Sequence, residues 1–320
     1  MVRFLLLFFS IFLFAKDIVD VYRFEGPSKM LSYAEKLITS TSYWRDRLKN
    51  KDVTFGYYET PKDILVCIKK DKVLKVYKNK NGKLVRVDQI KVLTGLDGDK
   101  EKEGDLKTPI GVYKLKSIIN NVDSFYGPFA FETSYPNLLD RINNKDGHGI
   151  WLHGVPLDGK RDSSNTKGCI VMQNDKLEKL KSEINYQNTY LLIAEKKPLY
   201  ATKDEIAGIL AFIYRWRRAW RDNDFNSYKR LYAKDFKKSD GKKLKQFLRY
   251  KKRVFSSKKG QKVEIYFTDI AIIPYQNIFM KKIFRVNMYE RYISKTYKYS
   301  GNKEIYVRLG ADGIKIIAEK

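Results

Sequence analysis

Two cysteines and two histidines are the residues of this 320-residue chain whose types and spacing say most about chemistry. Cys67 lies in the apolar run DILVCIKK, where a cysteine usually serves as a small core hydrophobe. Cys169 lies in NTKGCIVMQN, a polar, glycine-containing loop that leads into an apolar stretch. A thiol becomes a nucleophile near neutral pH when a neighbouring base or cation favours the thiolate, and histidine is the usual base. The sequence therefore indicates that Cys169 is a nucleophile served by one of the two histidines.

A disulfide and a zinc site are the alternative uses of these side chains. An oxidising compartment would permit a single Cys67–Cys169 bridge, but the two cysteines lie in very different surroundings. A zinc site would need further ligands, which no clear His or Cys spacing in the chain supplies. We therefore expect no metal and no cofactor.

His153 is the better placed of the two histidines. The segment GHGIWLHG is predicted to form a short strand, and a separation of five residues puts the two imidazoles on opposite faces of a regular strand. Only one of them can then meet Cys169. His153 precedes Gly154 and shares a strand face with Trp151, whereas His148 lies between two glycines and can be structural.

These residues form a pattern that resembles the L,D-transpeptidase catalytic domain, also called the YkuD domain. His153 and Gly154 are followed, after a loop, by the run TKGC that ends at Cys169. The family signature is a histidine, a spacer and then Ser/Thr-His-Gly-Cys. The runs EGDLKTPIGVY and SYPNLLDR also resemble this family, so that matches in the correct order cover roughly residues 60–195.

The resemblance implies a role for each matching residue. Cys169 is the nucleophile, His153 is the base, and the backbone carbonyl of Gly154 orients the imidazole. The implied substrate is the peptidoglycan stem peptide, in which Cys169 attacks the carbonyl before the terminal D-Ala and forms a thioester. Hydrolysis then yields a tripeptide, whereas capture by the amine of another stem yields a cross-link. Backbone N–H groups near Gly168 and Cys169 are expected to hold the oxyanion.

Two positions depart from the family pattern. Lys167 stands where a histidine is expected before the Gly-Cys pair, and Val171 stands where an arginine is often found. An ammonium or guanidinium group near the nucleophile can hold a stem-peptide carboxylate. For Arg161, an ordinary solvated charge on a surface loop is as good an interpretation as a substrate-binding role. The candidate substrate-binding residues are Trp151, His148, Arg161, Thr166, Lys167 and Gly168.

The N-terminus predicts export. Residues 1–15, MVRFLLLFFSIFLFA, have one arginine followed by a short apolar run that ends in a small residue. This is the layout of a signal peptide with cleavage after Ala15, and an uncleaved anchor is the alternative. No second apolar segment is long enough to span a bilayer, so we expect a periplasmic mature protein. Export makes nucleic acid an improbable partner, and the net charge of +27 then favours wall polymers that bear carboxylates.

Periodicity predicts a mixed β and α+β fold in three parts. Residues 16–55 contain an amphipathic helical stretch, and residues 56–198 are dominated by strands, with a hairpin turn at Asn81-Gly82 and a linker near residues 196–203. Residues 199–320 have helices first and an antiparallel sheet after. This last part is predicted to contain helices at residues 203–222, 228–232 and 244–254 and strands at residues 263–273, 283–293 and 304–317.

The complete arrangement resembles the cell-shape-determining L,D-carboxypeptidases of Helicobacter and Campylobacter, whose C-terminal part is similar to nuclear transport factor 2 (NTF2). The resemblance implies an L,D-carboxypeptidase whose N-terminal helical segment forms a homodimer. An L,D-transpeptidase is one alternative. A non-catalytic wall-binding protein with a glycan pocket in its C-terminal cone is the other. Trp216, Trp220 and Tyr232 can line such a pocket, although aromatic residues at helical spacing are more often core.

Overall fold

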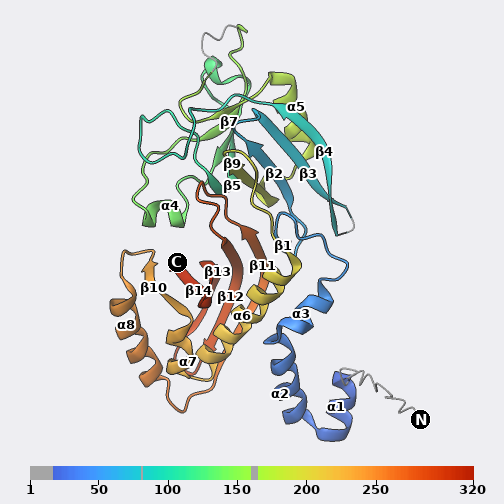
Figure 1. Ribbon diagram of the computed structural model, residues 1–320, viewed down its shortest axis with the longest axis vertical. Coiled ribbons are helices and arrows are strands. Elements are labelled where there is room, and N and C mark those ends of the chain that lie inside the picture. The colour runs from blue at the N-terminus through green and yellow to red at the C-terminus, as the bar shows by residue number, and fades with distance from the viewer. Residues whose placement is uncertain (1–16, 81, 160–164) are drawn as a thin grey trace, which may run out of the picture.

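The computed structural model describes residues 17–80, 82–159 and 165–320 of the chain. It contains an eight-stranded sheet, a six-stranded sheet and short helices at the N-terminus. Figure 1 shows the two sheets at opposite ends of the main body, with the N-terminal helices beside the long helix that covers the six-stranded sheet. The predicted fold class, a β-rich unit followed by an α+β unit, is confirmed. No helix within these described ranges is long and apolar enough to cross a membrane.

The N-terminal segment forms three helices instead of one amphipathic stretch. They are α1 (Ile18–Glu25), α2 (Pro27–Ile38) and α3 (Thr41–Arg47). Gly26 has a φ of +83° and separates α1 from α2, because this left-handed conformation cannot continue a helix. The segment is anchored to the long helix α6 (Lys203–Arg221). Trp44 stacks on Tyr214 with ring centroids 5.5 Å apart, and Glu35 binds Arg217 and Arg221.

The eight-stranded sheet has the order β4-β3-β2-β9-β5-β6-β7-β8. Its central strand β2 is an apolar run buried on both faces, as expected for a strand between two neighbours. Strands β3 and β4 form the predicted hairpin, of whose turn Asn81 lies outside the described residues. The strands are β2 (Asp63–Ile68), β3 (Val73–Lys80), β4 (Lys83–Lys91), β5 (Gly111–Ile119), β6 (Ala130–Thr133), β7 (Trp151–His153), β8 (Ile170–Val171) and β9 (Thr189–Ala194). Helix α4 (Leu138–Ile142) and helix α5 (Asn174–Glu183) complete this unit.

The strand predicted over residues 147–154 is shorter than expected. Only β7 is extended, because Gly147 and Gly149 have φ values of +85° and +67°, which a regular strand does not use. His148 therefore lies in a loop before the strand. The prediction that His148 and His153 occupy opposite faces of one strand was therefore wrong, because His148 is not part of the strand.

The six-stranded sheet has the order β1-β11-β12-β13-β14-β10, with α6 packed across it (Figure 1). Its strands are β1 (Tyr57–Tyr58), β10 (Tyr232–Lys238), β11 (Val263–Pro274), β12 (Ile283–Ser294), β13 (Lys298–Gly310) and β14 (Gly313–Glu319). Helices α7 (Phe225–Arg230) and α8 (Leu244–Ser257) lie beside it. The helix predicted over residues 228–232 ends earlier, and Tyr232 begins β10. Its parallel pairing with β14 is a long-range contact that overrides the short helical pattern.

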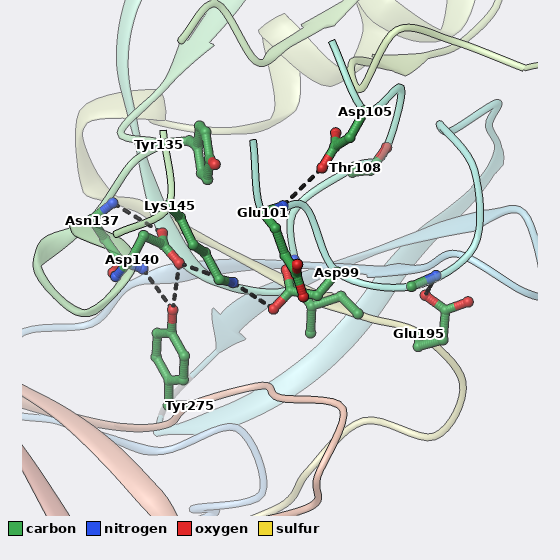
Figure 2. Close-up of polar contacts among 12 residues, drawn as sticks. Asp99, Glu101, Asp105, Thr108, Tyr135, Asn137, Asp140, Lys145, Glu195 and Tyr275 are labelled. Carbon is green, nitrogen blue, oxygen red and sulfur yellow. Dashed lines mark hydrogen bonds and ion pairs between the residues drawn. The ribbon is translucent and has the colours of Figure 1, made fainter. Parts of the chain in front are cut away.

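The two sheets share a hydrophobic core and a buried polar junction. Asn137 Nδ2 donates to Tyr275 Oη at 3.0 Å, and Tyr275 Oη donates to Asp140 Oδ1 at 3.3 Å (Figure 2). Tyr113 Oη donates to Asp140 Oδ2 at 3.0 Å. Burial raises the pKa of the Asp140 carboxyl, although Lys145 Nζ lies 3.4 Å away. The β-rich unit is therefore joined to the second sheet by hydrogen bonds as well as by apolar packing.

The predicted linker is part of this packing. The Leu199 backbone N–H donates to Gln276 Oε1 at 2.7 Å, and the Ala201 backbone N–H donates to the carbonyl of Thr54 at 3.0 Å. Both Leu199 and Ala201 are buried. The domain boundaries proposed from the sequence stay a prediction, but the segment between the units is not a free tether.

We predict that Tyr275→Phe destabilises the whole chain. It leaves Asn137 and Asp140 with one buried hydrogen bond fewer, which costs about 1–2 kcal/mol. Urea unfolding should show the loss in both units, because they share a core. Tyr266→Phe is the control, because the Tyr266 hydroxyl donates a hydrogen bond to Glu264 of its own strand, at the protein surface. An equal effect of the two substitutions would contradict the importance of the junction.

Candidate active site

The pairing of β7 with β8 brings the predicted base and nucleophile together. These short strands are parallel, with Leu152 opposite Ile170. Leu152 and Ile170 are fully buried and belong to the core of the sheet. Side chains alternate along a strand, so Trp151, His153 and Cys169 lie on the other face. Two adjacent strands therefore present the imidazole and the thiol on one side of the sheet.

The Cys169 side chain is half-buried and contacts both the loop and the strand opposite it. The Trp151 backbone N–H donates to Cys169 Sγ at 3.5 Å, and Sγ lies 3.5 Å from the carbonyl oxygen of Gly149. A backbone N–H directed at sulfur favours the thiolate, whereas a carbonyl favours the protonated thiol. Trp151 thus acts on the predicted nucleophile through its backbone, which the side-chain pattern of the sequence could not indicate.

The turn before the nucleophile is built by Thr166 and Gly168. Thr166 Oγ1 donates to the Cys169 carbonyl at 2.7 Å and accepts from the Gly168 backbone N–H at 3.0 Å. Gly168 has a φ of +121°, and a Cβ at this position would lie 2.8 Å from the Lys107 carbonyl oxygen. Both residues are therefore needed to shape the turn. Because the Gly168 N–H already binds Thr166, other N–H groups would have to provide most of the oxyanion stabilisation.

The His153 imidazole is held in one orientation. Its Nδ1 lies 2.7 Å from the Gly154 carbonyl oxygen, which can only accept, so Nδ1 carries the proton and Nε2 is the basic nitrogen. The ring packs edge-on against Tyr126, which packs edge-on against Trp151. A Cβ on Gly154 would lie 1.9 Å from Asn174 Oδ1. Nothing in the local sequence around Tyr126 or Asn174 marks them as site residues, so their positions could not be predicted.

The remaining predicted substrate-binding residues lie at the surface or outside the described part of the chain. Lys167 is exposed beside the catalytic turn and forms no ion pair with a described residue. The His148 side chain is 82% exposed, and its Nδ1 lies 4.0 Å from Glu103 Oε1. Arg161 lies outside the described residues. Their roles in substrate binding stay predictions.

The long loop at residues 94–108 packs behind the site and is stabilised by buried polar contacts. Although burial opposes its ionisation, Asp105 has a pKa below the usual range because Lys100 and three backbone N–H groups bind its carboxylate. Thr108 Oγ1 accepts from the Gly95 backbone N–H at 2.8 Å. Figure 2 shows Asp105 and Thr108 within this loop. The EGDLKTPIGVY run therefore matches residues that shape the loop.

The second cysteine belongs to the core. Cys67 is fully buried in β2, and burial raises the pKa of its thiol to about 12. Both cysteines are free, so the alternative of a Cys67–Cys169 disulfide was wrong. Within the described ranges, no three His, Cys, Asp or Glu side chains are grouped so that they could hold a metal ion.

The aromatic residues considered for a C-terminal pocket are part of the second core. Trp216 is fully buried, Tyr232 is buried, and Trp220 packs against the same cluster. Trp216 Nε1 donates to Tyr232 Oη at 3.0 Å, and Tyr232 Oη donates to Glu319 Oε2 at 2.8 Å. These contacts account for the aromatic side chains without a glycan.

Family models match both units. Residues 61–193 match the L,D-transpeptidase catalytic domain (YkuD), and residues 208–320 match the Cds6 C-terminal NTF2-like domain. Fold and site together thus define a protein with an L,D-transpeptidase-type catalytic domain followed by an NTF2-like domain.

Solved structures narrow this class. The helical cell shape determining protein Pgp2 from Campylobacter jejuni is 40% identical, with 88% of this chain and 99% of that chain covered and a TM-score of 0.83. Bd1075 from Bdellovibrio bacteriovorus is 28% identical, with 84% and 96% covered and a TM-score of 0.66. No curated protein sequence matches the chain. The chain belongs to the L,D-transpeptidase family and is a homologue of Pgp2, which confirms the resemblance inferred from the sequence.

We predict that the two cysteines differ strongly in reactivity. Iodoacetamide at neutral pH should modify Cys169 in the folded protein and Cys67 only after denaturation, because Cys67 is buried and its thiol is protonated. Mass spectrometry of the labelled peptides measures both sites. His153→Ala should slow the labelling of Cys169, since the imidazole no longer takes its proton. Comparable labelling of both cysteines in the folded protein would contradict this assignment.

Proposed function

We propose that this chain is an exported peptidoglycan L,D-carboxypeptidase that removes the terminal D-Ala from stem tetrapeptides and helps to set cell shape. One observation carries the proposal. Cys169 and His153 lie on one face of two paired strands, and the Gly154 carbonyl holds the imidazole with Nε2 as the base. Membership of the L,D-transpeptidase family and homology to the cell shape determining protein Pgp2 support it.

The proposed reaction has two steps. The Cys169 sulfur attacks the carbonyl carbon that joins the third residue to D-Ala, while His153 Nε2 takes the thiol proton and passes it to the leaving nitrogen. The C–N bond breaks, D-Ala leaves and a thioester remains. His153 then takes a proton from water, the water oxygen attacks the thioester, and the C–S bond breaks. The products are the tripeptide carboxylate and the regenerated thiol.

Hydrolysis is favoured over cross-linking by the charge beside the nucleophile. Lys167 is an exposed cation next to the turn that carries Cys169. A transpeptidase must admit the amine of a second stem, which arrives as a cation and is repelled there, whereas water is not. The same ammonium can hold the terminal carboxylate of the substrate. An L,D-transpeptidase is the alternative function.

Export and dimerisation complete the proposal. Residues 1–15 are proposed to be a signal peptide that delivers the protein to the periplasm, and they lie outside the described residues. The N-terminal helices are proposed to form a homodimer, because they expose large apolar side chains that a second copy could cover. These side chains are Val19, Tyr22, Phe24 and Leu31. The wall-binding alternative gains no support from Trp216 and Tyr232, which are core residues.

We predict that Cys169→Ala abolishes the release of D-Ala from a disaccharide tetrapeptide. The loss should be on the order of 10⁴-fold or more, because the nucleophile is removed, while the melting temperature stays within a few degrees. Mass analysis of the muropeptide products measures the reaction. Cys67→Ala is the matched control and should remain active. Activity in Cys169→Ala would refute the assignment of the nucleophile.

A second prediction concerns Lys167. With tetrapeptide as the only substrate, the purified protein should produce tripeptide and D-Ala without cross-linked dimers. Lys167→His should raise the fraction of dimers among the products, because the fixed cation is removed from the path of the amine. Lys176→His, which changes an exposed lysine of α5, should leave the ratio unchanged. Efficient dimer formation by the unmodified protein would instead favour the transpeptidase.

A further inference from the structure

The loop between β11 and β12 presents an apolar tip to solvent. Ile278, Phe279 and Met280 are consecutive and are 44%, 72% and 51% exposed. Three neighbouring exposed apolar side chains cost solvation free energy, and folding does not require them. This tip is therefore a candidate binding feature.

The tip is held rigidly. Asn277 Nδ2 donates to the carbonyls of Tyr275 and Lys281, and Asn277 Oδ1 accepts from the Lys281 backbone N–H at 2.9 Å. Met280 has a φ of +51°, which is uncommon for a residue with a side chain. A loop that is closed by its own asparagine and holds an uncommon backbone conformation presents Phe279 in a defined position.

A cleft of about 770 Å³ lies beside the tip, between the two units. Ile278 and Phe279 line the cleft together with the segment around α4 and with Glu101 and Lys102. Those two residues belong to the loop at residues 94–108, whose Lys107 carbonyl faces Gly168 of the catalytic turn. The cleft therefore adjoins the loop that supports the nucleophile.

Five basic and four acidic side chains line the cleft, and this balance suits a ligand with carboxylates. Asp99 is bound by Lys145, and Asp235 is bound by Arg308 through two hydrogen bonds. Lys102 and Lys281 also line the cleft, and neither forms an ion pair with a described residue. Lys281 Nζ lies 5.2 Å from the centre of the Phe279 ring. An exposed aromatic face next to these ammonium groups fits a muropeptide, because its sugar rings can stack on the aromatic ring while the carboxylates of its stem peptide lie near the ammonium groups.

We propose that this cleft binds the N-acetylated sugar part of the muropeptide, with the Phe279 ring as the surface on which a sugar ring stacks. The ring C–H face of a sugar is apolar, and an aromatic side chain covers it at little entropic cost. A flat membrane could contact the tip but could not enter the cleft, which favours a narrow ligand. The identity of the substrate rests on the proposed function, which this inference deepens.

The test compares substrates with and without sugars. Phe279→Ala should raise KM for the disaccharide tetrapeptide about tenfold, with kcat changed less than about twofold, because a contact made equally in the ground and transition states is lost. KM for the sugar-free tetrapeptide should not change. Tyr297→Ala removes another exposed ring, at the β12–β13 turn, and should behave as the unmodified protein. Since Phe279 is exposed, the Phe279→Ala protein should have the same melting temperature as the unmodified protein.

A binding experiment separates this inference from the proposed function. In Cys169→Ala protein, which cannot turn over, calorimetry with disaccharide tripeptide should show an affinity loss of about tenfold on adding Phe279→Ala. This result would support the cleft even if no D-Ala release were found. Equal KM changes for both substrates, or unchanged muropeptide affinity, would overturn it. It would also be overturned if Phe279→Ala abolished only co-sedimentation with phosphatidylglycerol vesicles, because the tip would then bind a membrane.

Discussion

The candidate site depends on the parallel pairing of two very short strands. Strand β8 consists of Ile170 and Val171 and is too short to persist alone, but it is paired on both sides. It lies against β7 on one side, and Val171 exchanges two backbone hydrogen bonds with Leu93 on the other. This pairing fixes the position of Cys169 along the strand direction relative to His153. The half-buried thiol and the buried imidazole lie on the same face because β7 and β8 are paired in this register, although Cys169 follows His153 by sixteen positions in the chain.

Buried lysines stabilise the loop behind this pair. Lys69 is buried, and its Nζ binds the Thr108 carbonyl at 3.1 Å and Glu195 at 3.1 Å. Lys100 binds Asp105 in the same loop. Removing one partner of a buried pair leaves an unpaired charge, so these contacts constrain the loop strongly. Part of the large positive charge is therefore structural, while exposed lysines such as Lys167 remain available to a ligand.

The second unit shapes the surroundings of the site through the shared core. The Asn137–Asp140–Tyr275 contacts join α4 to the chain just after β11. The loop that follows carries the Phe279 tip toward α4 and the loop at residues 94–108, where the cleft forms. A flexible tether could not hold these walls at a fixed separation. The packing of the two units thus forms a cleft beside the catalytic domain, and the shape of this cleft restricts which ligands can bind there.

The sequence by itself determined which residues form the candidate site and most of the regular elements. Cys169, His153 and Gly154 could be selected because scarce residue types stood in a recognisable order, and β2 and α6 could be predicted because their patterns are local. Tertiary structure decided the rest. His148 left the strand because of two glycine conformations, Tyr232 joined a strand because β14 offered a partner, and Asn174, Tyr126 and the Trp151 backbone entered the site by packing. Such contacts join residues that are far apart in the chain. They therefore produce no local pattern in the sequence from which they could be predicted.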